Sequence, residues 1–217
     1  MHPLKNSYSH TYAKHQRAAV DLSLSENPLG PSPKATASII KAAKSLHLYP
    51  NQEKTLINLL AQHHDITEDM ILLGAGANQL LEDFLKVFAL NKNIIVPSAT
   101  FPESVACMAT LNGSVKIVPL HNDFSLDLHA LRETCTSDTA FIHLCNPNNP
   151  TGIWTECGQL SELAKVSPVP LLISEASADF VEQTLINRSL HPNIIVIRSF
   201  SKAYGLAGLR IGYSIAS

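Results

Sequence analysis

The segment RSFSKAYGLAGLR, residues 198–210, follows an apolar run and sets one lysine, Lys202, among hydroxyl and small residues. An arginine, Arg210, comes eight positions later. A lysine on an ordinary solvent-exposed surface needs none of these neighbours. We therefore interpret the segment as the end of a buried strand and the loop that follows it, where sheet proteins of the α/β class gather their ligands.

Seven apolar, β-branched runs are expected to form strands. They are almost continuously hydrophobic rather than alternating, which indicates strands that are buried on both faces of a mostly parallel sheet. The segments between them, such as 77–89, 103–111 and 155–166, have helical length and periodicity. We predict a three-layer, doubly wound α/β fold. Its strands are expected at 70–74, 93–97, 115–120, 139–145, 169–174, 193–199 and 210–216.

Composition and charge exclude several classes of protein. The 217 residues, 45% of them hydrophobic, suffice for one large domain. A formal net charge of −2 with scattered lysines disfavours nucleic-acid binding. Residues 1–20 lack the apolar core of a secretion signal, and no apolar run approaches the roughly 18 residues of a membrane span. We expect a cytoplasmic protein without a membrane or nucleic-acid partner.

Residue types that bind metals are present, but not at metal-binding spacings. His63 and His64 are adjacent, so on a helix they point in different directions, and no HExxH pattern occurs. The four cysteines form no CxxC pair and are expected to be reduced, mostly buried thiols. We predict no metal ion. The cysteines are Cys107, Cys135, Cys145 and Cys157.

Polar or glycine-containing loops follow five of the predicted strands and should meet at one edge of the sheet. The loop after the first strand, GAGAN at 74–78, runs into a predicted helix. Small residues there let backbone N–H groups approach a phosphate, and the helix dipole favours an anion. A simple packed turn explains this loop alone equally well, but two serines and an arginine would complete a phosphate site. The expected phosphate contacts are Gly76, Ala77, Asn78, Ser199, Ser201 and Arg210.

Lys202 then has an expected role of its own. Like charge from Arg210 and desolvation both disfavour the ammonium form, which makes the amine a usable nucleophile toward an aldehyde. The phosphate-bearing aldehyde cofactor that meets this description is pyridoxal 5'-phosphate. The residues themselves therefore point to this cofactor.

Two long motifs resemble a known family. NPNNPTG (146–152) and SFSKAYGLAGLRIGY (199–213) are similar to the fold type I pyridoxal-phosphate enzymes of aminotransferase class I/II. Within them the chain resembles the histidinol-phosphate aminotransferase group and its relative threonine-phosphate decarboxylase. SENPLGPSP (25–33) and LYPN (48–51) resemble the N-terminal signatures of that group. The resemblance spans nearly the whole chain in the expected order.

The resemblance implies roles for individual residues. Lys202 matches the Schiff-base lysine, and Asn149 matches the asparagine that hydrogen-bonds the phenolic oxygen of the cofactor. Phe101 stands where the family stacks an aromatic ring on the pyridine, although an ordinary core phenylalanine fits that position too. The phosphate contacts predicted above match the phosphate cup of the family. Tyr49 matches a tyrosine that reaches the phosphate of the neighbouring subunit, which implies a homodimer.

The two ends of the chain are interpreted in the same way. Asn27 and Gly30 fall in the substrate-facing loop of the family, so residues 1–32 are expected to form an arm and residues 33–217 the large cofactor-binding domain. In the family a small C-terminal domain supplies the arginine that grips the substrate carboxylate. This sequence stops at Ser217, before such a domain. Either it is a fragment or it binds the cofactor without the usual clamp.

The fifth predicted strand departs from the family pattern in LLISEASADF, residues 171–180. Ser174 stands where the family has the aspartate that pairs with the protonated ring nitrogen, and Ser177 stands at a tyrosine position. A neutral hydroxyl holds that proton less well, so we expect a weaker electron sink. Glu175 is no easy substitute, because a one-residue step on a strand turns the side chain to the other face. Asp179 would need an unusual loop to reach back.

Three functions follow from this combination. The first is a histidinol-phosphate aminotransferase-like enzyme that acts on an amino acid or amino-alcohol phosphate and a keto acceptor. The second is a pyridoxal-phosphate-dependent decarboxylase or lyase of the threonine-phosphate type, which tolerates an unprotonated ring. The third is a degenerate homologue that binds the cofactor without transamination.

Overall fold

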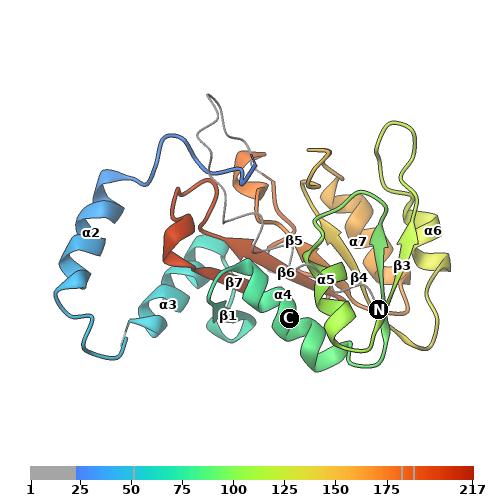
Figure 1. Ribbon diagram of the computed structural model, residues 1–217, viewed down its shortest axis with the longest axis horizontal. Helices are drawn as coiled ribbons and strands as arrows, with labels where there is room; N and C mark the ends of the chain where they lie inside the picture. Colours follow the sequence, from blue (N-terminus) through green and yellow to red (C-terminus); the bar gives the residue numbers. More distant parts are fainter. Residues whose placement is uncertain (1–22, 51, 182, 188) are drawn as a thin grey trace.

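The computed structural model describes residues 23–217 apart from 51, 182 and 188. Its centre is a seven-stranded sheet in the order β1-β7-β6-β5-β4-β2-β3 (Figure 1). Strand β7 runs antiparallel to both of its neighbours, and the other neighbouring pairs are parallel. The mostly parallel sheet predicted from the sequence is confirmed. The strands are β1 (Ile71–Gly74), β2 (Asn93–Pro97), β3 (Ser114–Val118), β4 (Thr139–Cys145), β5 (Leu171–Ser174), β6 (Ile194–Ser199) and β7 (Gly212–Ile215).

Three strands differ from the sequence prediction by two residues at one end. Strand β3 ends before Pro119 and β5 begins after Pro170, because proline has no N–H to donate to a neighbouring strand. Strand β7 begins at Gly212, two residues later than expected, since Arg210 adopts a left-handed backbone with φ of 54°. Arg210 therefore belongs to the loop before the strand.

Helices cover both faces of the sheet, as the apolar strands require. Side chains that alternate along a strand enter opposite layers. Phe141 of β4 packs in the core beneath α4 and α5, and Ile142 packs in the core beneath α3, α6 and α7. The α4 and α5 layer lies in front of the sheet in Figure 1. The helices are α3 (Glu53–His64), α4 (Ala77–Phe88), α5 (Glu103–Thr110), α6 (Leu128–Glu133) and α7 (Cys157–Val166), with 3-10 turns η1 (Glu68–Met70), η2 (Ala178–Phe180) and η3 (Ala207–Leu209).

Helix α2 (Pro33–Ala43) stands apart from this body, at one end of the molecule in Figure 1. Its N-terminus is capped by Ser32, whose hydroxyl accepts the Ala35 N–H at 3.2 Å. None of its residues is buried. The exposed apolar side chains of this helix and the segment after it are Ile40, Leu46, Leu48 and Tyr49.

The described residues bear on the expectations about a membrane span, a metal site and the cysteines. In this part of the chain no helix combines the length and the apolar character needed to cross a membrane. No three metal-binding side chains gather among the same residues. All four cysteines are free, two of them buried and two half-buried. Residues 1–20, on which the absence of a secretion signal was judged, lie outside the described part, as does Asn51 of the LYPN signature.

Candidate active site

Lys202 lies in the turn after β6, at the edge where the parallel strands end. Its side chain is half-buried, and Nζ donates a hydrogen bond to the main-chain oxygen of Leu24 at 2.5 Å. Burial lowers the pKa of Lys202; the Glu26 carboxylate opposes this and the positive charge of Arg210 adds to it. The net direction is the one predicted from desolvation and like charge. The neutral amine is therefore more accessible than on an ordinary surface lysine.

Arg210 folds back over the lysine loop. Its left-handed backbone ends η3, and Nη1 then donates to the Ala207 carbonyl at 3.2 Å and to Ser201 Oγ at 3.4 Å. Ser199 is buried and its Oγ accepts the Ser201 N–H at 3.0 Å, so this hydroxyl shapes the turn. The structure thus brings the guanidinium and the Ser201 hydroxyl together.

Gly76 joins this pair to the start of α4. Its φ is 88°, and a Cβ at this position would collide with Arg210 Nη2, so only glycine lets the guanidinium lie over the loop. Gly212 allows an equally close approach, because a Cβ there would stand 2.7 Å from the Ala77 nitrogen. The first turn of α4, which begins at Ala77 and includes Asn78, has no side-chain cap from Gly76.

These groups make up a candidate phosphate cradle. N–H groups at a helix N-terminus, a hydroxyl and a fork-shaped cation are the donor set that a phosphate dianion requires. The predicted contacts Gly76, Ala77, Asn78, Ser201 and Arg210 lie around it, and Ser199 lies behind it.

Cys145 is the point where several predicted positions meet. It ends β4 directly opposite Ser174 of β5. Burial raises the pKa of its thiol, and the neighbouring polar groups of Thr100, Phe101, Asn149 and Ser174 partly oppose that rise. Cys145 was expected only to be a buried thiol, although its place just before NPNNPTG was a usable signal.

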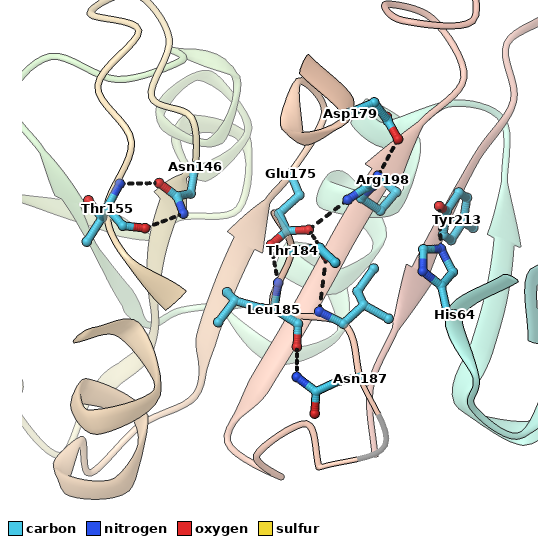
Figure 2. Close-up of polar contacts among 11 residues, drawn as sticks. His64, Asn146, Thr155, Glu175, Asp179, Thr184, Leu185, Asn187, Arg198 and Tyr213 are labelled. Atoms are coloured by element: carbon cyan, nitrogen blue, oxygen red, sulfur yellow. Dashed lines mark hydrogen bonds and ion pairs between the residues drawn. The ribbon is translucent and has the colours of Figure 1, made fainter. Parts of the chain in front are cut away.

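The NPNNPTG loop is held by two asparagines other than the predicted one. Asn146 donates to the Thr155 carbonyl at 2.9 Å and accepts the Thr155 N–H at 2.8 Å (Figure 2). Asn148 donates to the carbonyl of Ala99 at 2.8 Å. Its buried Oδ1 has no hydrogen-bond partner among the described groups. The side chain of Asn149 is exposed at the same edge, so it is accessible to a ligand.

The strand argument about Glu175 is confirmed. Glu175 faces away from Ser174 and accepts hydrogen bonds from Arg198, Thr184 and Leu185, as Figure 2 shows. Asp179 pairs with Arg198 as well. Ser177 is half-buried and precedes η2. Both carboxylates are therefore engaged with Arg198 rather than with the Cys145–Ser174 pair.

The N-terminal loop lies against the lysine loop. Asn27 Nδ2 donates to the Ala203 carbonyl at 3.0 Å. Gly205 has a φ of 65°, and a Cβ there would collide with the Gly30 backbone, so glycine allows the two loops to touch. Between them lies a cavity of about 430 Å³ that Asn27, Gly30, Ala203 and Tyr204 help to line. The predicted substrate-facing residues thus lie next to the lysine loop.

Tyr49 is 97% exposed in the connection between α2 and α3, so within the described chain it lines no site.

His143 was not predicted. It is fully buried two residues before Cys145 on β4, with Nδ1 at 2.9 Å from Ser104 Oγ, and burial lowers its pKa to about 4. No sequence pattern distinguished this histidine from the others.

Comparison with known proteins gives a consistent picture. Residues 17–217 match the sequence model of the family described as aminotransferase class I and II. A histidinol-phosphate aminotransferase of Leuconostoc citreum is 37% identical over 204 residues, which are 89% of this chain and 58% of the relative. One of Anaeromyxobacter sp. is 34% identical over 204 residues, 90% of this chain and 56% of the relative.

A solved structure agrees with these sequences. Histidinol-phosphate aminotransferase from Sinorhizobium meliloti, in complex with pyridoxal-5'-phosphate, superposes with a TM-score of 0.80 at 29% identity. The match covers 88% of this chain and 55% of that one. The chain therefore spans little more than half the length of the relatives it matches.

Proposed function

Because the chain belongs to the class I and II aminotransferase family, we propose that it binds pyridoxal 5'-phosphate and transfers amino groups between an amino acid or amino-alcohol phosphate and a keto acceptor. The observation that carries this proposal is the placement of Lys202. A half-buried lysine with a lowered pKa stands at the edge of a parallel sheet, beside the cradle formed by Gly76, Ser201 and Arg210. The curated relatives named histidinol-phosphate aminotransferase support this class of substrate.

The residues present fit the cofactor. The first turn of α4, the Ser201 hydroxyl and the Arg210 guanidinium would hold its phosphate, and the amine of Lys202 would bond to its aldehyde carbon. Asn149 would donate to the phenolic oxygen, and Phe101 would stack on the ring. When bound, the cofactor supplies the electron sink for a bond broken at the substrate α-carbon.

The side chains around the cradle then have separate tasks. Lys202, with its amine free, would take the proton from the substrate α-carbon as a general base. Its lowered pKa keeps a larger fraction of the amine neutral for this step. The loop that contains Asn27 and Gly30 covers the lysine turn and restricts the access of water.

The uncharged side chains at the end of β5 favour a second candidate reaction. The neutral Ser174 hydroxyl and Cys145 thiol stand together there, and Glu175 and Asp179 are engaged with Arg198. Without a carboxylate the ring nitrogen is less readily kept protonated. Decarboxylation or elimination of the threonine-phosphate type, which depends less on that proton, is the alternative, and a homologue that binds the cofactor without turnover is the limiting case.

We also propose an assembly and a location. The chain forms a homodimer in which the exposed apolar segment around α2 packs against a second copy and Tyr49 reaches the phosphate of that copy. Residues 33–217 then make up the large cofactor-binding domain, and residues 1–32 make up an N-terminal arm and substrate-facing loop. Four free cysteines favour a reducing compartment, the cytoplasm.

Product analysis tests the reaction. The chain loaded with pyridoxal 5'-phosphate is incubated with histidinol phosphate and, separately, with O-phosphothreonine. Conversion of the amino substrate to a carbonyl product together with an aminated cofactor is the expected result. Carbon dioxide with an amine product would favour the decarboxylase instead. If neither substrate is converted while the cofactor stays bound, the degenerate homologue is the correct description.

A further inference from the structure

A buried hydrogen bond joins strand β4 to the first turn of helix α5, close to the candidate site. His143 Nδ1 lies 2.9 Å from Ser104 Oγ, and both side chains are fully buried. His143 points to the α4 and α5 face of the sheet, because it lies two residues after Phe141 on the same strand. Cys145, two residues later, points to that face as well. The proposed reaction uses neither His143 nor Ser104.

Packing alone does not explain a histidine at this position. The second ring nitrogen of His143, Nε2, is buried and has no hydrogen-bond partner among the described residues. A buried polar atom without a partner costs free energy, and an apolar side chain of similar size, such as leucine, would avoid this cost. The contact between Nδ1 and Ser104 is therefore what distinguishes this histidine from an apolar residue.

The segment that contains Phe101 depends on side-chain contacts of this kind. Residues 99–101 lie between β2 and α5 and make no backbone–backbone hydrogen bond with the described part of the chain. Asn148 donates to the Ala99 carbonyl at 2.8 Å, two residues before Phe101. Ser104, three residues after Phe101, contacts His143. Hydrogen bonds to β4 and to the NPNNPTG loop therefore hold this segment on both sides of Phe101.

Phe101 itself is not placed like an ordinary core phenylalanine. Its side chain is half-buried, and among the described residues it belongs to neither of the two hydrophobic cores beside the sheet. Core packing therefore does not fix the ring. The position of the ring follows from the segment on either side of it.

We propose that His143 is a positioning residue for Phe101: by holding Ser104 it fixes the start of α5 against β4 and so sets where the Phe101 ring meets the cofactor. The stacking of Phe101 on the cofactor rests on the proposed function. The attachment of residues 99–104 to β4 needs no cofactor, so the two ideas can fail separately.

Three substitutions change this contact in different ways. His143→Leu and Ser104→Ala remove it from either side, and Ser104→Ala keeps the test open if His143→Leu does not fold. His143→Asn places an amide where the ring has Nδ1, so it should retain the contact. Thr139→Val is the matched control, because it removes another buried hydrogen bond of β4, from Thr139 Oγ1 to Asn93 Oδ1 at 2.8 Å, at the opposite end of the strand.

Hydrogen exchange of the chain without cofactor measures the attachment. Residues 99–104 should exchange about tenfold faster in His143→Leu and Ser104→Ala than in the wild type, because the segment opens locally. Strands β5 and β6 should keep their wild-type rates, and His143→Asn and Thr139→Val should leave the exchange of 99–104 unchanged. Unchanged exchange of 99–104 in both disruptive variants, or an equal increase in Thr139→Val, would overturn the proposal. An equal increase is what a general loss of stability in β4 would give.

Cofactor dissociation shows whether the attachment acts through Phe101. Pyridoxal 5'-phosphate should leave His143→Leu and Ser104→Ala about tenfold faster than it leaves the wild type, His143→Asn or the Thr139→Val control. In a Phe101→Leu chain, which lacks the ring, the same two substitutions should speed dissociation no further, because the effects of residues that act through one another do not add. An equal acceleration with and without the Phe101 ring would overturn the link to Phe101.

The proposed function and the attachment give separate results. A wild-type chain that takes up no cofactor would contradict the proposed function. The exchange rates of residues 99–104 in that chain and in its variants would still decide whether His143 holds the segment.

Discussion

Cys145 and Ser174 stand directly opposite each other on neighbouring parallel strands. The Ser174 side chain and the backbones of Phe101 and Asn149 all act to lower the pKa of the buried Cys145 thiol, against the larger effect of burial. The side chain at position 174 therefore lies among the residues expected around the cofactor ring. The neutral group at that position is the departure from the family pattern that the sequence led us to expect.

Replacing Ser174 tests the importance of this neutrality. Ser174→Asp should raise the rate of amino transfer by about tenfold or more, because a carboxylate favours the protonated ring nitrogen and each pKa unit corresponds to about 1.4 kcal/mol. The rate is measured in a single turnover of the loaded chain with an amino donor. Ser174→Asn is the control of equal shape without charge. An equal gain in both variants, or none in Ser174→Asp, would contradict the electrostatic explanation.

The phosphate cradle makes a prediction about glycine. Gly76→Ala should weaken cofactor binding by tenfold or more and cost roughly 1–3 kcal/mol of stability, because the φ of 88° is strained for alanine and Arg210 must move. Gly158→Ala is the control, since a Cβ there has open space and Gly158 lies in α7. Cofactor titration and urea unfolding measure the two effects. Wild-type affinity in Gly76→Ala would show that Arg210 does not close the cradle.

The burial of His143 predicts that the folded chain loses stability at acidic pH. The pKa of this histidine is about 4 in the folded chain, against 6.5 for an ordinary histidine, so between these pH values the unfolded chain binds a proton that the folded chain does not. Stability is therefore lost as the pH falls through this window, by up to about 3 kcal/mol from this residue. His143→Asn should flatten that loss and keep a partner for Ser104. His64, whose pKa is also lowered to about 4 by burial, should still contribute its own part of the stability loss in the His143→Asn chain.

Urea unfolding at a series of pH values between 4 and 7 measures the difference between the two proteins. The exposed His129, replaced by Asn, serves as the control and should leave the pH dependence unchanged. A His143→Asn chain that loses stability as steeply as the wild type would show that the buried imidazole is not the group responsible.

The proposed dimer makes a prediction about mixed chains. Tyr49→Ala should weaken the binding of cofactor phosphate at the site of the second copy, and Lys202→Ala should abolish covalent binding at its own site. When the two variants are mixed and allowed to exchange subunits, a mixed dimer has one intact site. About a quarter of wild-type tight binding should therefore return, as follows from random pairing of identical interfaces. No recovery in a mixture whose exchange is verified by mass would contradict the shared site.

Much of the fold was predictable, because its strands are short apolar runs buried on both faces. Runs such as 139–145 carry that signal locally, and the loops after parallel strands must meet at one edge. The strand ends were misjudged where prolines or the left-handed Arg210 interrupt the pattern. The neighbourhood of Lys202 and Arg210 followed from the same topology.

The features that escaped prediction depend on contacts between distant residues. The opposition of Cys145 and Ser174 is set by the register of β4 and β5, which no local pattern reveals. The pairing of Arg198 with Glu175 depends likewise on the register of β5 and β6 and on alternation along both strands. Helix α2 is amphipathic, yet none of its residues is buried. A sequence pattern shows that a helix has an apolar face, but it does not show what packs against that face.

The central claim is that one amine, that of Lys202, bonds to pyridoxal 5'-phosphate held by the cradle around Arg210. Borohydride reduction of the chain after incubation with this cofactor, followed by peptide mass spectrometry, tests it most directly. We expect a single pyridoxyl group on Lys202 and none on the Lys202→Ala chain. Labelling of exposed lysines such as Lys34 and Lys41, with Lys202 unmodified, would contradict it.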